Sequence, residues 1–264
     1  TAIGIDITLA FYILFAIEII AFLRLYANPL NKTLREITTE QYKRVLDYLH
    51  SLIPSDAKEK NTLSTILVGS LTVIFIAMAA WSLWWAFKVW YTNVDTVFTR
   101  WDAVVSWNRW ATEWFSGNFP TDSKRYAQLI PTNFAVSYAF LRGTEIQFFA
   151  KSLMPLFNFF ILLMLFELGI TQKRSGYFIA VVVARFVIKK FLGNYIVSGY
   201  VDVALAFFSL VPFYTLLKAK SSQGGEQQNY LFLGAILAAG AALTKQNGLF
   251  VLVTYPILAY LIVI

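Results

Sequence analysis

Three short polar motifs contain the residues of this sequence that could do chemistry, and each adjoins an apolar run. They are Arg100–Trp101–Asp102, Gly199–Tyr200–Val201–Asp202 and Thr244–Lys245–Gln246–Asn247–Gly248. A carboxylate such as Asp102 can take the proton of an acceptor hydroxyl as it attacks, and a basic group such as Lys245 can neutralise a leaving phosphate. The second carboxylate, Asp202, could bind a metal ion, orient the acceptor or stay protonated. Together these groups fit a reaction between a lipid-borne donor and an acceptor at a membrane surface.

The same residues also have structural interpretations that need no chemistry. Asp202 opens an apolar run, where an aspartate is commonly a helix N-cap. Lys245 lies between two apolar runs, where a lysine often extends its ammonium group to the membrane surface. His50 is the only histidine of the chain and is best interpreted as solvated.

The first motif lies in an aromatic stretch, residues 99–131, that follows an apolar run. This stretch mixes four tryptophans with charges of both signs: Trp101, Trp107, Trp110, Trp114, Arg100, Asp102, Arg109 and Glu113. Indole rings favour the headgroup level of a bilayer, where neighbouring charged groups stay hydrated. We therefore expect Asp102 to be held at a membrane–water interface.

The composition excludes an ordinary soluble globule. Of 264 residues, 58% are hydrophobic and 14% are charged, whereas soluble domains have about 25% charged residues. A net charge of +7 in such a chain indicates membrane topology and contact with anionic lipid, not nucleic-acid binding. The chain has no cysteine, so it has no disulfide and no thiolate metal site.

The apolar runs predict an all-α fold, a polytopic transmembrane helix bundle with about seven spans. Residues 1–24 are predicted to be an N-terminal transmembrane helix, and 25–62 a cytoplasmic polar loop with a short amphipathic helix. Residues 63–264 are predicted to form one transmembrane module with an outer loop at 92–147. Its spans are expected at 63–91, 148–170, 177–192, 201–217, 230–243 and 249–264.

Lysine and arginine bias predicts the orientation. Residues 25–62, 171–176 and 218–229 are rich in these residues and should be cytoplasmic, so loop 92–147 and all three motifs should share the outer face. Lys189 and Lys190 then lie at the outer end of a span, against this bias. Lys189 shares a helix face with Arg185, and the pair could meet a lipid phosphate or ordinary headgroups.

The chain resembles membrane glycosyltransferases of the GT-C fold, in particular the protein O-mannosyltransferase and aminoarabinose transferase group. The resemblance depends on the order of four segments along residues 63–264: Arg100–Asp102, Tyr126–Pro131 (YAQLIP), Gly199–Asp202 with its continuation ALAFF, and Ala242–Gly248 (ALTKQNG). Trp101–Asp102–Ala103 is also similar to the mannosyltransferases of lipid-anchor synthesis.

The resemblance implies a multi-pass plasma-membrane enzyme that takes a sugar from a polyprenyl-phosphate carrier to a lipid, glycan or protein acceptor. Asp102 would be the general base, Asp202 a second acidic residue at the site, and Lys245 a basic residue near the carrier phosphate. Arg100, Tyr126, Arg185 and Lys189 are expected to help bind substrate. No cofactor is implied with certainty; a divalent metal ion held by Asp102 and Asp202 is one interpretation.

The chain departs from the family pattern at two positions. An Asp–Glu doublet is replaced by Asp102–Ala103, and a Tyr-Pro-Pro element by Tyr126–Ala127–Gln128. The family's later spans are absent, and we expect that the chain continues beyond Ile264. A transporter or a non-catalytic membrane assembly subunit remains an alternative, although polar groups at one face favour an enzyme over a transporter.

Overall fold

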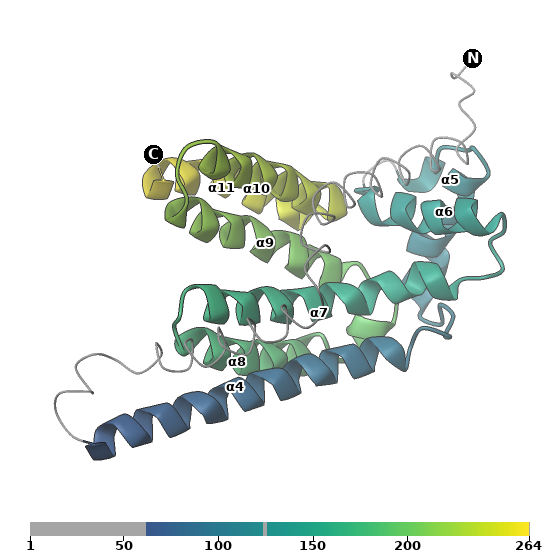
Figure 1. Cartoon of the computed structure of the whole chain (residues 1–264). Coiled ribbons are helices and arrows are strands. Elements are labelled where there is room, and N and C mark those ends of the chain that lie inside the picture. Colours follow the sequence, from purple (N-terminus) through teal and green to yellow (C-terminus); the bar gives the residue numbers. More distant parts are fainter. Residues whose placement is uncertain (1–61, 124–125, 264) are drawn as a thin grey trace, which may run out of the picture. The chain divides into compact units, whose positions relative to one another are not determined.

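The part of the chain that the structure describes is built from helices. A computed structural model describes residues 62–123 and 126–263, and Figure 1 shows the order of its elements. The α-helices are α4 (Thr62–Tyr91), α5 (Arg109–Phe115), α6 (Leu129–Leu141), α7 (Phe148–Thr171), α8 (Gly176–Phe191), α9 (Asp202–Ser221), α10 (Gly224–Thr244) and α11 (Leu249–Val263). A π-helix, η1 (Ala103–Asn108), and three 3₁₀-helices, η2 (Thr121–Ser123), η3 (Gly193–Val197) and η4 (Gln246–Gly248), lie between them. None of the described residues forms a β-strand, which confirms the predicted all-α class.

Three of the described helices are long and apolar enough to cross a membrane. They are Leu67–Tyr91 within α4, Phe148–Thr171 and Asp202–Ser221. These segments correspond to the predicted spans 63–91, 148–170 and 201–217. The described residues therefore indicate a membrane protein, but they do not support the prediction of about seven spans.

The other predicted spans among the described residues are too short or too polar to cross a membrane on their own. A bilayer core about 30 Å thick needs about 20 apolar helical residues. α8 has 16 residues and includes Arg185, Lys189 and Lys190, and α11 has 15 residues. α10 has 21 residues, but its first turns are polar (GGEQQN). The predicted span 1–24 and the predicted polar loop, up to residue 61, lie outside the described residues.

The chain divides into two compact units. The described part of the first unit is residues 62–81 with Leu165–Val183, where the Phe178 ring packs against Gly169 and meets Phe166 edge to face at 5.3 Å. The second unit is Ser82–Met164 with Ala184–Ile264. It contains every residue that the sequence proposed for the site.

The predicted outer loop, 92–147, folds into short helices whose buried side chains belong to a core shared with α7 and α9. η1, α5 and α6 pack together around Phe134 and Tyr138, which are fully buried. Trp107 and Trp110 belong to this core and are each 5% exposed, whereas Trp101 is 79% exposed. The tryptophans were all expected at a membrane interface; two of them instead fill the interior of the segment.

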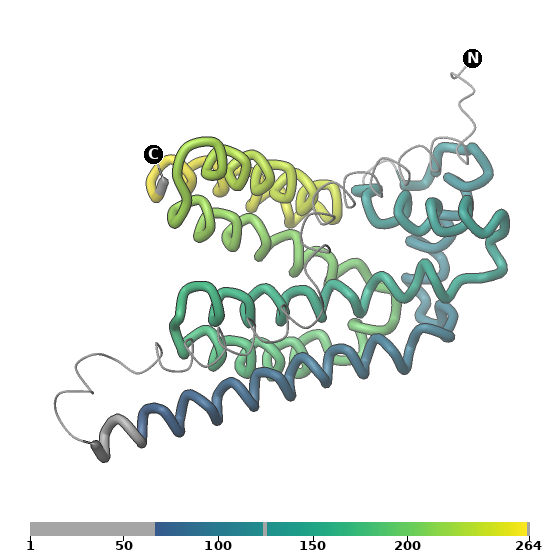
Figure 2. Tube along the Cα trace, viewed as in Figure 1, coloured from purple at the N-terminus to yellow at the C-terminus, as the bar shows by residue number. Residues whose placement is uncertain are grey.

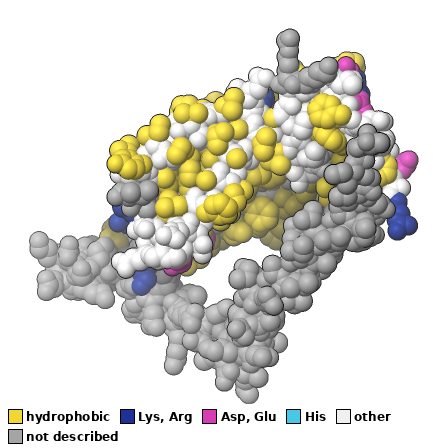
Figure 3. Space-filling view, turned by 90° about the horizontal axis from the view of Figure 1, so that it is seen from above, with side chains coloured by type: hydrophobic (Ala, Val, Ile, Leu, Met, Phe, Trp, Pro, Cys, Tyr) yellow, Lys and Arg dark blue, Asp and Glu magenta, His cyan; other side chains and the backbone are white. Residues whose placement is uncertain are grey.

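Three consecutive helices, α9, α10 and α11, pack on one another at the C-terminal end of the second unit (Figure 2). Their shared core contains Leu216, Ala238, Ala241, Val251 and Tyr255. The face seen in Figure 3 is covered mainly by hydrophobic side chains, and Lys, Arg, Asp and Glu appear near its ends. Phe232 and Phe250 are among the exposed apolar residues of α10 and α11. Such a surface is unfavourable in water and is typical of contact with lipid or protein.

We expect Gly234→Ala to destabilise the α9–α11 core. A Cβ at Gly234 would lie 2.0 Å from the Tyr255 hydroxyl and 2.2 Å from Thr215 Oγ1. The Tyr255 hydroxyl donates a hydrogen bond to the Leu231 carbonyl at 2.9 Å, so it cannot move aside without losing a partner. Overpacking of this kind costs about 1–3 kcal/mol, which thermal unfolding in detergent would measure.

Gly225→Ala, in the first turn of the same helix, is the matched control. Nothing lies within 4 Å of a Cβ there, so alanine should be neutral or stabilise by up to about 1 kcal/mol. Equal unfolding temperatures for the two variants would contradict the packing described for Gly234.

Candidate functional site

The second and third polar motifs meet through an ion pair. Lys245 Nζ donates to Asp202 Oδ1 at 2.8 Å, although 43 residues separate them in the sequence. Asp202 is in the first turn of α9, where a negative charge also interacts favourably with the helix dipole. No side-chain capping bond forms at this N-terminus, whose N-cap is Val201, so the expected role of Asp202 as an N-cap is not what the structure shows.

Lys245 reaches Asp202 because the chain breaks its helix there. Its backbone is extended, with φ −159° and ψ 150°, between the end of α10 and η4. The next turn is tight: the Gly248 N–H donates to the Lys245 carbonyl, and a Cβ on Gly248 would lie 1.9 Å from the Ala241 carbonyl oxygen. This turn therefore requires glycine at position 248, where there is no room for a side chain.

The first motif lies against the second at Gly199. This glycine has φ +88°, in the left-handed region, and a Cβ there would lie 2.4 Å from the Phe98 ring and 3.3 Å from the Ala103 Cβ. Phe98, Ala103 and Val201 share one buried cluster. Since Phe98 and Ala103 flank Arg100–Asp102, this contact brings the start of η1 beside the turn that leads to Asp202.

The linker between α4 and η1 is also attached to the start of α7. The Phe98 N–H donates to Gln147 Oε1 at 3.3 Å, and Lys151 Nζ donates to Thr96 Oγ1 at 2.7 Å. Lys151 is 6% exposed, which is unusual for a lysine, and its partner is neutral. The sequence did not single out this residue, because a lysine early in an apolar run resembles a snorkelling residue.

Asp102 is exposed at the beginning of the π-helix. Its backbone is helical, its side chain makes no capping bond, and the carboxylate has no hydrogen-bond or ion-pair partner among the described residues. π-Helical turns are rare and occur frequently at functional sites. Of the two candidate carboxylates, Asp102 is therefore the one free to accept a proton, because Lys245 holds one oxygen of Asp202.

Buried and ionic contacts stabilise the two helices that follow Asp102, η1 and α5. The buried Tyr138 hydroxyl donates to Asn108 Oδ1 at the end of η1, and burial raises the pKa of Tyr138. Arg109 pairs with Asp122 and Glu113, and hydrogen bonds to Asp122 and then Glu113 raise the pKa of this guanidinium.

Tyr126, the proposed substrate contact in YAQLIP, lies next to this core. Its ring centroid is 5.2 Å from that of Trp110 and 6.1 Å from that of Trp107, and its side chain is 55% exposed. One side of the Tyr126 side chain therefore packs against the buried tryptophans, and the rest of it is exposed.

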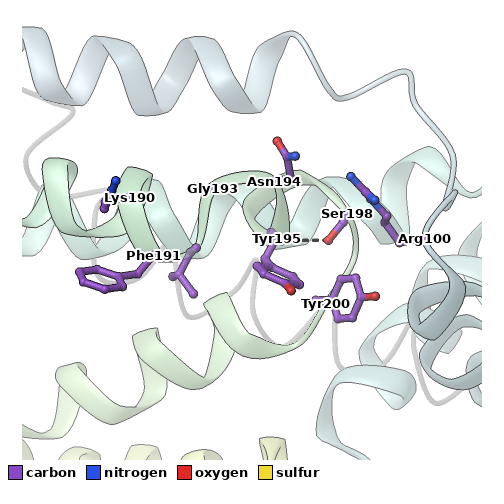
Figure 4. Close-up of a pocket in the computed structure, with 9 residues that line it drawn as sticks. Arg100, Lys190, Phe191, Gly193, Asn194, Tyr195, Ser198 and Tyr200 are labelled. Carbon is purple, nitrogen blue, oxygen red and sulfur yellow. Dashed lines mark hydrogen bonds between the residues drawn. The ribbon is translucent and has the colours of Figure 1, made fainter.

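A pocket of about 310 Å³ opens beside the Gly199 turn, between Arg100 and the end of α8 (Figure 4). Its lining residues come from the first motif, α8, η3 and the following turn: Arg100, Lys190, Phe191, Leu192, Gly193, Asn194, Tyr195, Ser198 and Tyr200. The Tyr195 and Tyr200 rings meet edge to face at 4.9 Å, and Ser198 Oγ donates to the Tyr195 carbonyl at 3.2 Å. Of these lining residues, the sequence indicated only Arg100 as a substrate contact.

Arg185 and Lys189, which the sequence offered as a pair for a lipid phosphate or for ordinary headgroups, have different surroundings in the structure. Arg185 lies 5.3 Å from the centre of the Trp85 ring, in a cation–π contact, and Lys189 is exposed and does not line the pocket. Lys190, which the sequence left without a role, lines it together with Arg100. Arg185 and Lys189 therefore do not act as a pair on this pocket.

The described residues offer no cluster of further ligands for the metal ion predicted at Asp102 and Asp202. Within residues 62–123 and 126–263, no group of three or more His, Cys, Asp or Glu side chains could hold a metal ion. Metal binding by Asp102 and Asp202 stays a prediction, and no step of the proposed reaction uses it.

Comparisons of this chain with protein-family models, with curated proteins and with solved structures find no match. The resemblance to GT-C glycosyltransferases therefore depends on the motifs themselves, and the three that surround Asp102, Asp202 and Lys245 come together in the fold.

We expect Gly199→Ala to disrupt the junction between the first two motifs. A Cβ would clash with the Phe98 ring and would also occupy an unfavourable φ. Gly117→Ala is a matched control, because Gly117 has φ +77° and open space around it. The free energy of unfolding should fall by about 1–2 kcal/mol in the control, from backbone strain alone. It should fall clearly further in Gly199→Ala, which adds the clash with Phe98. Equal losses in unfolding experiments would show that Phe98 does not constrain position 199.

A double-mutant cycle with Asp202→Asn and Lys245→Gln should give a small coupling energy for folding. The two side chains are 34% and 38% exposed, and exposed pairs contribute about 0.2–1 kcal/mol. Unfolding of the four proteins in detergent measures this coupling. A value well above this range would indicate that the pair mainly stabilises the fold, against a role in the site.

Proposed function

We propose that this chain is a multi-pass membrane glycosyltransferase that takes a sugar from a polyprenyl-phosphate carrier. The acceptor is a hydroxyl of a lipid, glycan or protein at the extracytoplasmic face of the membrane. Three apolar helices support residence in a membrane, and the resemblance of the motifs supports the reaction class.

The observation that supports this proposal best is the meeting of the three motifs. Ala103, next to Asp102, lies against Gly199, and Asp202 is paired with Lys245. Transport proteins usually place the polar groups of their binding sites near the bilayer midplane. Here Asp102 is exposed, and it precedes a helical segment outside the three candidate spans.

In the proposed reaction, the acceptor oxygen attacks the anomeric carbon of the donor sugar. A bond forms between these two atoms, and the bond between the anomeric carbon and the phosphate oxygen breaks. The proton of the acceptor hydroxyl passes to the Asp102 carboxylate, and the phosphate leaves as an anion on its polyprenyl chain. General-base assistance increases as the attacking hydroxyl becomes more acidic in the transition state, where the carboxylate must be within hydrogen-bond reach.

Asp202 has a different role in this proposal. Its pairing with Lys245 holds the carboxylate in place, since the ammonium group restrains one of its oxygens. The free Oδ2 can accept a hydrogen bond from a sugar or acceptor hydroxyl. Because Lys245 already forms an ion pair with Asp202, its charge is partly neutralised. This weakens the assignment of Lys245 to the carrier phosphate.

The test is turnover by the purified protein in lipid nanodiscs with a panel of polyprenyl-phosphate sugars. Asp102→Asn keeps the size of the side chain but cannot take the proton, so turnover should fall by about 10²–10⁴ while donor binding changes little. Asp202→Asn should lower turnover less, through weaker substrate binding.

Asp95→Asn is the matched control, because Asp95 is also exposed and lies in the same linker, seven residues before Asp102. It should leave turnover unchanged. If Asp102→Asn retained normal transfer while Asp202→Asn abolished it, the base would be Asp202. Full activity in both variants would exclude both carboxylates as the base. No turnover by the unchanged protein with any donor of the panel would reject the glycosyltransferase proposal in favour of a transporter or an assembly subunit.

A further inference from the structure

The pocket beside the Gly199 turn has an uncompensated positive charge. Its lining residues include two cations, Arg100 and Lys190, and no acid. Both side chains are exposed, and neither has a hydrogen-bond or ion-pair partner among the described residues. Two such charges next to one cavity attract an anion, and the charges are strongest where the cavity wall limits solvent.

Three other basic side chains near the site already contact a neighbouring side chain. Lys245 is paired with Asp202, Arg185 lies over the Trp85 ring, and Lys151 donates to Thr96. An incoming anion would have to displace one of these contacts to bind there. At Arg100 and Lys190 it would displace only water.

The pocket is divided into a polar side and an aromatic side. In Figure 4, Lys190, Asn194 and Arg100 point to one side of η3, whereas the rings of Phe191, Tyr195 and Tyr200 point to the other. Arg100, Lys190 and Asn194 offer only N–H donors together with one amide oxygen, which suits a group rich in acceptor oxygens. Phe191 is 75% exposed and Tyr195 is 48% exposed, so the aromatic side is open to a hydrocarbon chain.

We propose that this pocket binds a phosphate group carried on a lipid, with Arg100 and Lys190 as its charge partners. A phosphate monoester has terminal oxygens that accept hydrogen bonds from a cation, and a guanidinium can bind two of them at once. A volume of about 310 Å³ accommodates the headgroup and the first part of the chain, while the remainder of the chain follows the exposed aromatic rings into the bilayer. Use of the pocket as the donor site rests on the proposed glycosyltransferase function, but phosphate binding does not.

The neighbouring lysines provide a direct test. Lys189 and Lys190 are both exposed and adjacent in α8, but only Lys190 lines the pocket. The immobilised protein, in a neutral detergent, is incubated with radiolabelled polyprenyl monophosphate, and the retained label gives the affinity. Lys190→Gln and Arg100→Gln should each weaken binding by about tenfold, since each removes a hydrogen bond between charged groups. Lys189→Gln should bind like the unchanged protein.

Further variants make the result independent of folding. Lys190→Arg retains the charge and should retain binding, so a loss equal to that of Lys190→Gln would contradict the proposal. The same holds for unchanged binding in the Arg100→Gln/Lys190→Gln double variant, or for an equal loss in Lys189→Gln. Thermal unfolding of each variant shows whether a loss comes from misfolding.

Competition identifies the source of the phosphate. Unlabelled polyprenyl monophosphate should displace the label, and inorganic phosphate should do so only at far higher concentration. Displacement by inorganic phosphate at the same concentration would overturn the assignment to a lipid. Asp102→Asn should bind the labelled lipid normally. Lipid binding without sugar transfer in the unchanged protein would reject the transferase and leave the phosphate pocket in place.

Discussion

The contact between Phe98 and Gly199 is the constraint on which the candidate site depends. The Phe98 ring occupies the space that a side chain at position 199 would need, and the left-handed backbone of Gly199 is tolerated because it has none. This contact holds the beginning of η1 next to the turn before α9. Without it, Asp102 and Arg100 would have no fixed relation to Asp202, Lys245 or the pocket of η3.

Compensation of charge determines what each basic and acidic residue can do. A carboxylate that already has an ammonium partner, such as Asp202, is held in place by it. An exposed carboxylate without a described partner, such as Asp102, keeps its capacity to accept a proton. The same argument separates Lys245 from Arg100 and Lys190, which are free to meet an external anion. Residues of the same type thus differ in function because their neighbours differ.

The aromatic segment 99–131 illustrates how one composition serves two purposes. Trp107 and Trp110 stabilise η1 and α5 from inside, together with Tyr138 and Phe134. Trp101, on the same short segment, stays exposed beside Asp102. The buried tryptophans make the segment rigid enough to present the exposed residues. A catalytic carboxylate needs such support, since a displacement of about 1 Å can reduce the rate about 100-fold.

The sequence by itself determined the helical class, the three helices that are long and apolar enough to cross a membrane, and the three polar motifs next to apolar runs. Hydropathy and helical periodicity are local properties, so they can be read without the fold. The described residues do not support the predicted number of spans, because α8, α10 and α11 have apolar runs that are shorter or more polar than a bilayer requires.

Only the tertiary structure decided which charges are paired, which tryptophans are buried, and that Lys190 instead of Lys189 lines a pocket. These outcomes depend on contacts between residues far apart in the chain, such as Asp202 with Lys245 and Phe98 with Gly199. No spacing along the sequence encodes such contacts, because they arise only when separate helices pack against one another.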